Sequence, residues 1–170
     1  MIDFILNPGS KDDKTSIDLA TRTGNFIPNE RRHEYPPAKL QESIKMFAET
    51  NPKAILRSVT AVYNCIGLVF SSRRTWIDTQ YVRKILYEDS YRQIANLSEI
   101  NVGDLVIYTK DKQINHIGII IKIEKNIMHA SFKYTVMSKW GPFGEYLHDI
   151  DDVPTSFGPS KEFWTDRKLV

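Results

Sequence analysis

Hydrophobic side chains recur at helical spacing in the first half of the chain. Leu40, Ile44 and Phe47 lie at positions i, i+4 and i+7, which places them on one face of a helix. This spacing predicts an amphipathic helix over residues 39–50, and the Asn-Pro pair that follows is expected to end it. Residues 1–36 are rich in polar and turn-forming residues, and we expect them to form an N-terminal arm that is partly irregular.

Two further helices are predicted before residue 90. The apolar run from Cys65 to about Arg73 does not alternate between apolar and polar positions, and this favours a mostly buried helix over a strand. Asp78 is expected to cap a second helix over residues 79–88, because an aspartate side chain accepts hydrogen bonds from the first N–H groups of a helix. Three apolar residues of that helix share one face: Val82, Ile85 and Leu86.

The pattern changes after residue 100 to short β-branched and aromatic runs. Polar turns separate these runs, which cover residues 104–109, 116–124, 126–132 and 134–140. Gly141-Pro142 then predicts a turn into a return strand. Helices followed by consecutive strands predict an α+β fold, in which N-terminal helices pack on an antiparallel β-meander. We expect residues 37–170 to form a single domain.

Composition narrows the classes of function. The 23 basic and 21 acidic residues leave a formal charge of +2 and are mixed along the chain, so neither nucleic acid nor a membrane is an expected partner. The N-terminus lacks the regions of a signal peptide, which predicts a cytoplasmic location, with delivery as an effector as an alternative. No cofactor is expected, because nucleotide-binding motifs are missing from the sequence. No metal is expected either, because one cysteine and scattered histidines lack the close ligand pairs of a zinc site.

The single cysteine, Cys65, has two interpretations. A free cysteine is more often a small buried hydrophobic residue than a nucleophile. However, Cys65 follows Asn64 at the predicted start of a helix, where unpaired backbone N–H groups favour a thiolate. A nucleophilic cysteine also needs a base, usually a histidine that the fold brings close.

Two of the four histidines are candidates for this base and for a residue that orients it. His116 opens the most apolar predicted strand, and the glycine two residues later would let another chain approach closely. His129 lies on the next predicted strand, and a tight turn would bring the two rings within reach. One ring could then orient the other, as the third member of a catalytic triad does. His33 lies in the polar arm and is not expected to take part.

Three motifs in order, "YNCIGLVF", "INVGDLVIYT" and "NHIGIIIKIEKNIMHAS", resemble the NlpC/P60 group of papain-like cysteine hydrolases. The resemblance covers residues 63–132. It implies a papain-like catalytic domain with Cys65 as nucleophile, His116 as general base and His129 as orienter. It also implies a cysteine peptidase or amidase, with murein-type peptides as one substrate class. The stretch "SSRRTWID" and the C-terminal tail depart from the wall-cleaving members, which leaves the substrate open.

The segment "SKWGPFGEYLH", residues 138–148, has two interpretations. In the first it is a strand, a turn and a return strand, with Trp140 in the core. In the second, Trp140 forms a wall of a substrate cleft, and Glu145 or His148 orients the base in place of His129. Both a carboxylate and an imidazole can fix the tautomer of a histidine, so the chemistry does not choose between them.

The implied mechanism is attack by the Cys65 thiolate on a carbonyl carbon, after the thiol has passed its proton to His116. The backbone N–H of Cys65, with the side chain of Asn64 or Tyr63, would hold the oxyanion.

The expected partner is a peptide or protein amide substrate, and a protein partner or inhibitor that masks the cleft is a further alternative. Two other functions stay open: a protein-modifying effector or toxin (a deamidase or acyl transferase), and a non-catalytic binding domain on the same fold. Arg73 and Arg74 are expected to be solvated at the end of the Cys65 helix.

Overall fold

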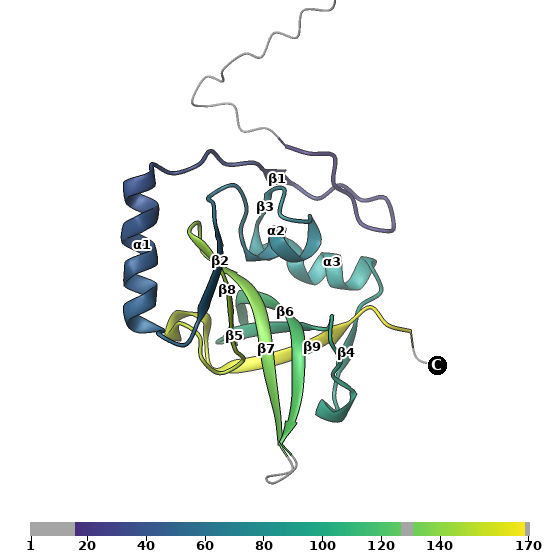
Figure 1. Cartoon of the computed structure of the whole chain (residues 1–170). Coiled ribbons are helices and arrows are strands. Elements are labelled where there is room, and N and C mark those ends of the chain that lie inside the picture. The colour runs from purple at the N-terminus through teal and green to yellow at the C-terminus, as the bar shows by residue number, and fades with distance from the viewer. Residues whose placement is uncertain (1–15, 127–130, 169–170) are drawn as a thin grey trace, which may run out of the picture.

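The computed structural model describes residues 16–126 and 131–168, and it shows an α+β protein with one large sheet (Figure 1). This confirms the predicted fold class. The sheet has seven strands in the order β2-β8-β7-β6-β5-β9-β4, with antiparallel neighbours, and β1 and β3 pair separately. The strands are β1 (Asn29–Glu30), β2 (Ile55–Val59), β3 (Trp76–Ile77), β4 (Arg92–Ile94), β5 (Leu105–Lys110), β6 (Gln113–Asn126), β7 (Ser131–Trp140), β8 (Gly144–Asp149) and β9 (Ser160–Thr165).

The helices agree with the predicted ones to within a few residues. They are α1 (Pro37–Thr50), α2 (Cys65–Phe70) and α3 (Val82–Glu88), with short 3-10 turns η1 (Thr79–Tyr81), η2 (Leu97–Glu99) and η3 (Thr155–Phe157). Helix α2 ends before Arg73, because Ser72 and Arg73 have positive φ angles of 51° and 67°, which a helix does not allow. Asp78 caps η1 rather than α3, and its carboxylate accepts a hydrogen bond from the Gln80 N–H at 3.0 Å.

Strands β5 to β8 are consecutive neighbours, as a meander requires. Most of the predicted strand over residues 126–132 lies outside the described residues; its described ends belong to β6, which extends to Asn126, and to β7, which begins at Ser131. Three strands of the large sheet were not predicted: β2, which joins β8 at one edge, and β9 and β4, which follow β5 at the other. The short strands β1 and β3 were not predicted either. The sheet is therefore larger than the predicted meander.

A bulge in β6 decides which of its side chains face the helices. Tyr108 pairs with His116, whereas Thr109 pairs with Ile114, so Asn115 is an extra residue on the β6 side. An extra residue shifts the inward–outward alternation of a strand by one position. As a result, His116 shares a face with Tyr108, and Ile117 points to the opposite face.

Two hydrophobic clusters cover the two faces of the sheet. The first lies between the sheet and helices α2 and α3, which Figure 1 shows packed side by side at one end of the sheet. It includes Ile27 of the N-terminal arm, so residues of the arm contribute to the core. The second cluster lies on the other face, because its members Val106 and Tyr108 alternate along β5 with Leu105 and Ile107 of the first.

Helix α1 lies beside β2, away from the other two helices (Figure 1). Its Phe47 packs edge-on against Trp140 and Tyr146, with ring centroids 5.3 and 5.9 Å apart. Such aromatic contacts tie α1 to β7 and β8. Within residues 16–126 and 131–168, none of the helices has the length and apolar character to cross a membrane.

Candidate functional site

Cys65 begins α2 and is partly exposed at the edge of the first hydrophobic cluster. The side chain of Asn64 holds this position in place. Its Oδ1 accepts from the N–H of Gly67 at 2.9 Å, which caps the helix, and its Nδ2 donates to the carbonyl of Ile77 at 2.7 Å. Desolvation raises the pKa of Cys65 to about 11, while hydrogen bonds from the Ile117 backbone and the helix start act against this rise. The thiol is therefore protonated at neutral pH.

Lys139 lies beside this thiol on strand β7. Because Ser138 pairs with Gly118, Lys139 is next to Ile117, the residue whose backbone hydrogen-bonds Cys65. The lysine side chain is fully buried, with 0% exposure, and its Nζ donates to the carbonyl of Gly141 at 3.2 Å. Burial lowers the pKa of Lys139 to about 8, although the charges of Glu34, Cys65 and Glu145 favour its protonated form. A buried amine and the thiol thus interact electrostatically on one face of the sheet.

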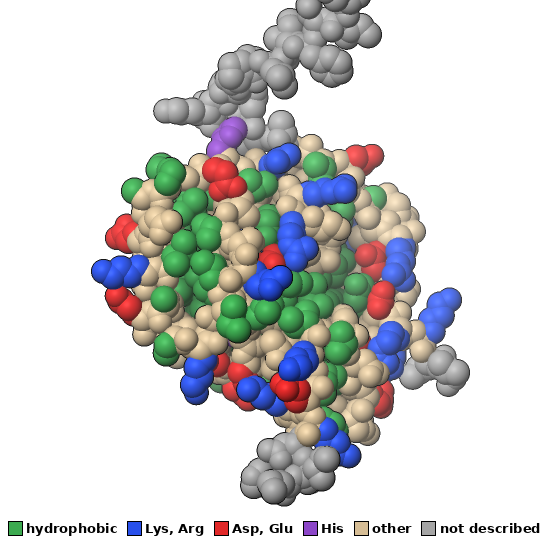
Figure 2. Space-filling model, in the orientation of Figure 1, with side chains coloured by type: hydrophobic (Ala, Val, Ile, Leu, Met, Phe, Trp, Pro, Cys, Tyr) green, Lys and Arg blue, Asp and Glu red, His purple; other side chains and the backbone are tan. Residues whose placement is uncertain are grey.

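Glu145 pairs with Lys139 across strands β7 and β8 and lies on the same face. Its carboxylate accepts hydrogen bonds from the Tyr63 hydroxyl at 2.9 Å and from Arg73 Nε and Nη2 at 2.8 and 3.1 Å. Burial acts to raise the pKa of Glu145, but the hydrogen bonds and charge of Arg73, together with Tyr63 and Lys139, lower it below its usual value. Figure 2 shows basic side chains grouped with an acidic one amid hydrophobic side chains, in the region where Figure 1 places α2, β2 and β8.

Two of the residues predicted for the site, Tyr63 and Asn64, precede Cys65 directly in the chain. Glu145, one of the two predicted alternatives for an orienting residue, is linked to this segment through the Tyr63 hydroxyl. However, the Tyr63 hydroxyl already donates to Glu145, and the Asn64 amide donates one of its two hydrogens to the Ile77 carbonyl. Their role as oxyanion donors stays a prediction, and for Tyr63 it requires the bond to Glu145 to change.

His116 lies on the other face of the sheet, which is a correction to the predicted meeting of Cys65 and His116 across a groove. Its ring stacks on Phe157 at 3.7 Å and 12°, within the second cluster, and is 2% exposed. Burial, with a smaller contribution from His148, holds the pKa of His116 well below its usual value. Nε2 of this ring has no hydrogen-bond partner in the described part of the chain. The bulge at Asn115 is the physical reason, because it turns Ile117 rather than His116 toward Cys65.

His148 lies on the same face as His116. The Trp140 indole donates to Ser138 Oγ at 3.0 Å, Ser138 bonds His148 Nε2 at 2.8 Å, and His148 Nδ1 donates to the Asp149 carbonyl at 2.8 Å. This chain satisfies a neutral imidazole, in keeping with burial as the main cause of its lowered pKa. His148 is therefore not placed to orient a group at Cys65. His129 lies outside the described residues.

Trp140 is a core residue in this structure. Its side chain has 0% exposure and stacks on Tyr146 at 4.3 Å. The interpretation in which it forms a wall of an open cleft is wrong for this arrangement, and the alternative of a buried strand end is the one observed. The reason is the packing of α1, whose Phe47 covers the ring.

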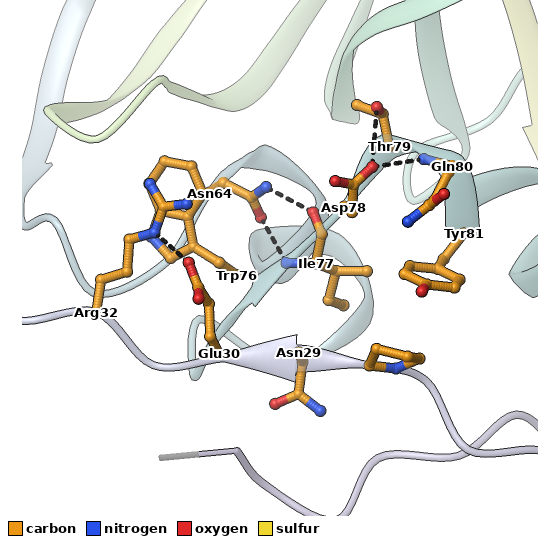
Figure 3. A pocket seen from close by; sticks show the side chains of 11 residues that line it. Asn29, Glu30, Arg32, Asn64, Trp76, Ile77, Asp78, Thr79, Gln80 and Tyr81 are labelled. Atoms are coloured by element: carbon orange, nitrogen blue, oxygen red, sulfur yellow. Dashed lines mark hydrogen bonds and ion pairs between the residues drawn. The ribbon is translucent and has the colours of Figure 1, made fainter. Parts of the chain in front are cut away.

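A cavity of about 520 Å³ opens next to the start of α2 (Figure 3). Asn64 lines it, together with residues of β1, β3 and η1. On one side the guanidinium of Arg32 lies 3.6 Å above the Trp76 ring and pairs with Glu30 at 2.7 Å. The cavity therefore offers an aromatic surface with charges of both signs, one residue from the cysteine.

An α+β domain with a large antiparallel sheet and a cysteine at the head of a helix packed on it is the arrangement of the papain-like cysteine hydrolases. The family model described as the NlpC/P60 family matches residues 53–151, more than half of the chain, and the chain belongs to this family. Its members are generally cysteine peptidases or amidases. The comparisons with curated proteins and with solved structures gave no match.

Sequence reasoning missed two residues near Cys65. Lys139 was part of a predicted strand. Because side chains alternate between the two faces of a sheet, the sequence does indicate that Lys139 points to the face opposite that of Ser138 and Trp140. Arg73 was expected to be solvated, but it binds the buried Glu145. Only the pairing of β7 with β8 and the left-handed turn after α2 bring these charges together.

Proposed function

We propose that this protein is a cysteine-dependent amide hydrolase with Cys65 as its nucleophile. The observation that carries the proposal is that the only cysteine lies inside the segment matched by the NlpC/P60 family and borders a buried cluster of ionised groups. Ionised groups beside a thiol are a common feature of reactive cysteines, since a thiolate needs a nearby proton acceptor and a compensating charge.

The chemistry needs four steps. The Cys65 thiol gives its proton to a base, and the thiolate attacks the carbonyl carbon of the amide. The backbone N–H groups of Cys65 and Ile66, which hydrogen-bond the sulfur in the free protein, are available to the oxyanion. The tetrahedral intermediate collapses as the leaving amine takes a proton, and water then hydrolyses the thioester to release the acid and regenerate the thiol.

The identity of the base is a separate part of the proposal. The sequence assigns His116 as base and His129 as orienter by resemblance to the family. His116 would have to leave its stack on Phe157 and cross to the Cys65 face to act. A His116→Gln variant tests this: loss of turnover with an unchanged fold supports such a rearrangement, and full turnover excludes His116 as base.

The substrate class that fits best is an amide in a peptide or protein chain. The cavity is lined by Asn64, the residue before Cys65, and its mixed charges at Arg32 and Glu30 suit a peptide substrate that carries both carboxylates and amines. Murein-type peptides have this character. Transfer of the acyl group to an amine, or deamidation of a protein glutamine, would use the same thioester and differ only in the attacking or leaving group.

The test compares wild type with Cys65→Ala and Cys65→Ser on a panel of murein-type peptides and glutamine-containing proteins, with amine or ammonia release as readout. Ser131→Ala, at an exposed position, is a matched control. We expect turnover in wild type and the control, a covalent acyl adduct on Cys65 by mass spectrometry, and loss of both in the Cys65 variants. Turnover that survives in Cys65→Ala contradicts the proposal.

A second candidate function is that of a non-catalytic binding domain, in which Cys65 does not act as a nucleophile. The raised pKa of the Cys65 thiol and the separation of His116 from it favour this alternative. It predicts that wild type and Cys65→Ala bind the same peptide with equal affinity and that neither releases amine. A protein partner that covers the cleft belongs to the same alternative, and co-purification with such a partner in both variants would support it.

A further inference from the structure

Lys139 is an unusual lysine because its side chain is fully buried. Lysines are almost never fully buried unless their charge is paired. Five titratable or charged side chains from the packed elements face or surround it: Glu34 of the arm, Tyr63 and Cys65 at the start of α2, Arg73 after α2, and Glu145 on β8.

The carboxylates around Lys139 are already satisfied by other groups. Glu145 accepts two hydrogen bonds from Arg73 and one from Tyr63. Glu34 accepts hydrogen bonds from the Thr60 hydroxyl and from the Ala61 N–H. In contrast, the one hydrogen bond that Lys139 donates within the described part of the chain goes to the Gly141 carbonyl. Among the described residues the Lys139 amine therefore makes no hydrogen bond to either carboxylate, although the charges of both favour its protonated form.

The Cys65 thiol lies on the same face of the sheet as Lys139, and the two groups affect each other's pKa. The thiol lies against the Ile117 backbone, and Lys139 occupies the neighbouring position on β7. The Lys139 Nζ is also 5.3 Å from the ring of Tyr63, two residues before Cys65. Histidines 116 and 148 are on the opposite face of the sheet, so Lys139 is the basic side chain beside the thiol among the described residues.

We propose that Lys139 is the general base of Cys65, and that the hydrogen-bonded pair of Glu145 and Arg73 positions it. This inference rests on the proposed function and adds a catalytic residue to it. Neutral Lys139 takes the thiol proton, which leaves a thiolate and an ammonium. After attack on the amide carbonyl, the ammonium gives that proton to the leaving amine and is neutral again. Lys139 then takes a proton from the water that hydrolyses the thioester, and returns it to the departing sulfur.

A lysine base predicts a different pH dependence from a histidine base. A buried amine whose pKa is about 8 becomes a proton acceptor only as the pH rises through that value. Both kcat/KM and the rate of thiol alkylation should then increase with a midpoint near this value. A base of the histidine type would give a rising limb below about pH 6.5.

The experiment measures iodoacetamide alkylation of Cys65 against pH in wild type, Lys139→Met and Lys139→Arg, with circular dichroism to confirm folding. Lys110→Met, at an exposed end of β5, is the matched control. We expect wild type and the control to show a midpoint near that of Lys139. Lys139→Met should react at least about tenfold more slowly near pH 8, the factor for a thiol pKa higher by one unit. Lys139→Arg should lose the midpoint near that of Lys139, because arginine does not titrate in this range. Arg keeps the positive charge but cannot accept a proton, so it separates a base from a mere cation.

The outcomes distinguish this inference from the proposed function. Alkylation profiles that coincide in wild type and Lys139→Met overturn the role of Lys139, and so does a Lys139→Arg profile that keeps the wild-type pH midpoint. Amide turnover that is lost in Cys65→Ala but unchanged in Lys139→Met leaves the hydrolase proposal standing and removes Lys139 as base. If Lys139→Met fails to fold, Lys139→Gln takes its place, and the arginine variant still decides the question.

Discussion

Burial of Lys139 predicts a specific dependence of stability on pH. The pKa of its amine falls from 10.5 to about 8 on folding. Between these values the unfolded chain binds more protons than the folded one, so the free energy of unfolding increases as the pH rises. A lowering from 10.5 to about 8 corresponds to about 3 kcal/mol when fully expressed. Over the accessible range from about pH 7 to about pH 9.5 the gain is about 2 kcal/mol.

Lys139→Met removes this effect, because methionine fills a similar volume without a charge. The assay is urea denaturation of wild type and Lys139→Met at several pH values, followed by circular dichroism. The stability of wild type relative to the variant should rise by about 2 kcal/mol between about pH 7 and about pH 9.5. Repeating the pair in a Cys65→Ala background removes the titration of the thiol, whose raised pKa acts in the opposite direction. A difference between wild type and Lys139→Met that stays constant with pH would refute the reasoning.

Three further changes have expected outcomes. Gly67→Ala should destabilise the protein by about 3 kcal/mol in thermal or urea unfolding, because a Cβ there would lie 1.7 Å from the Thr75 carbonyl oxygen; an unchanged midpoint would contradict this close approach. Asn64→Ala should cost about 1–2 kcal/mol through the lost helix cap, and Asn64→Asp, which keeps the acceptor, should cost less; equal losses would show that the cap is not the cause. His116→Phe should reduce the loss of stability in acid. The pKa of buried His116 is lowered, so the unfolded state binds a proton that the folded state does not. The free energy of unfolding of wild type therefore falls below about pH 6.5, by about 1.4 kcal/mol per pH unit for one histidine. Equal acid sensitivity of wild type and His116→Phe would exclude this contribution.

The local features of the cysteine could be predicted because they depend on neighbours in the sequence. Asn64 is a good cap residue, and an apolar run follows it, so the start of α2 at Cys65 is visible without a structure. The same holds for α1 and for the strands of the meander, whose side-chain periodicity is a local property. The motifs around Cys65 also pointed to the family that the family model matches.

The partners of the cysteine depend on register, which periodicity does not reveal. The bulge at Asn115 adds one residue to β6, and that single residue turns His116 away from Cys65 and into the stack with Phe157. Likewise, β2 and β9 are short strands whose sequences mix polar and apolar residues. They become strands because β2 pairs with β8 at one edge of the sheet and β9 pairs with both β5 and β4.

The sequence by itself therefore determined the α+β class, the family and the position of Cys65 at the head of a helix, because caps, periodicity and motifs act over a few residues. Only the tertiary structure decided which basic group lies beside the thiol. Lys139 reaches Cys65 through the pairing of β6 with β7, and Glu145 and Arg73 join it through β8 and the turn after α2. These contacts link residues more than 70 positions apart, and their charge states follow from burial, which no local pattern specifies.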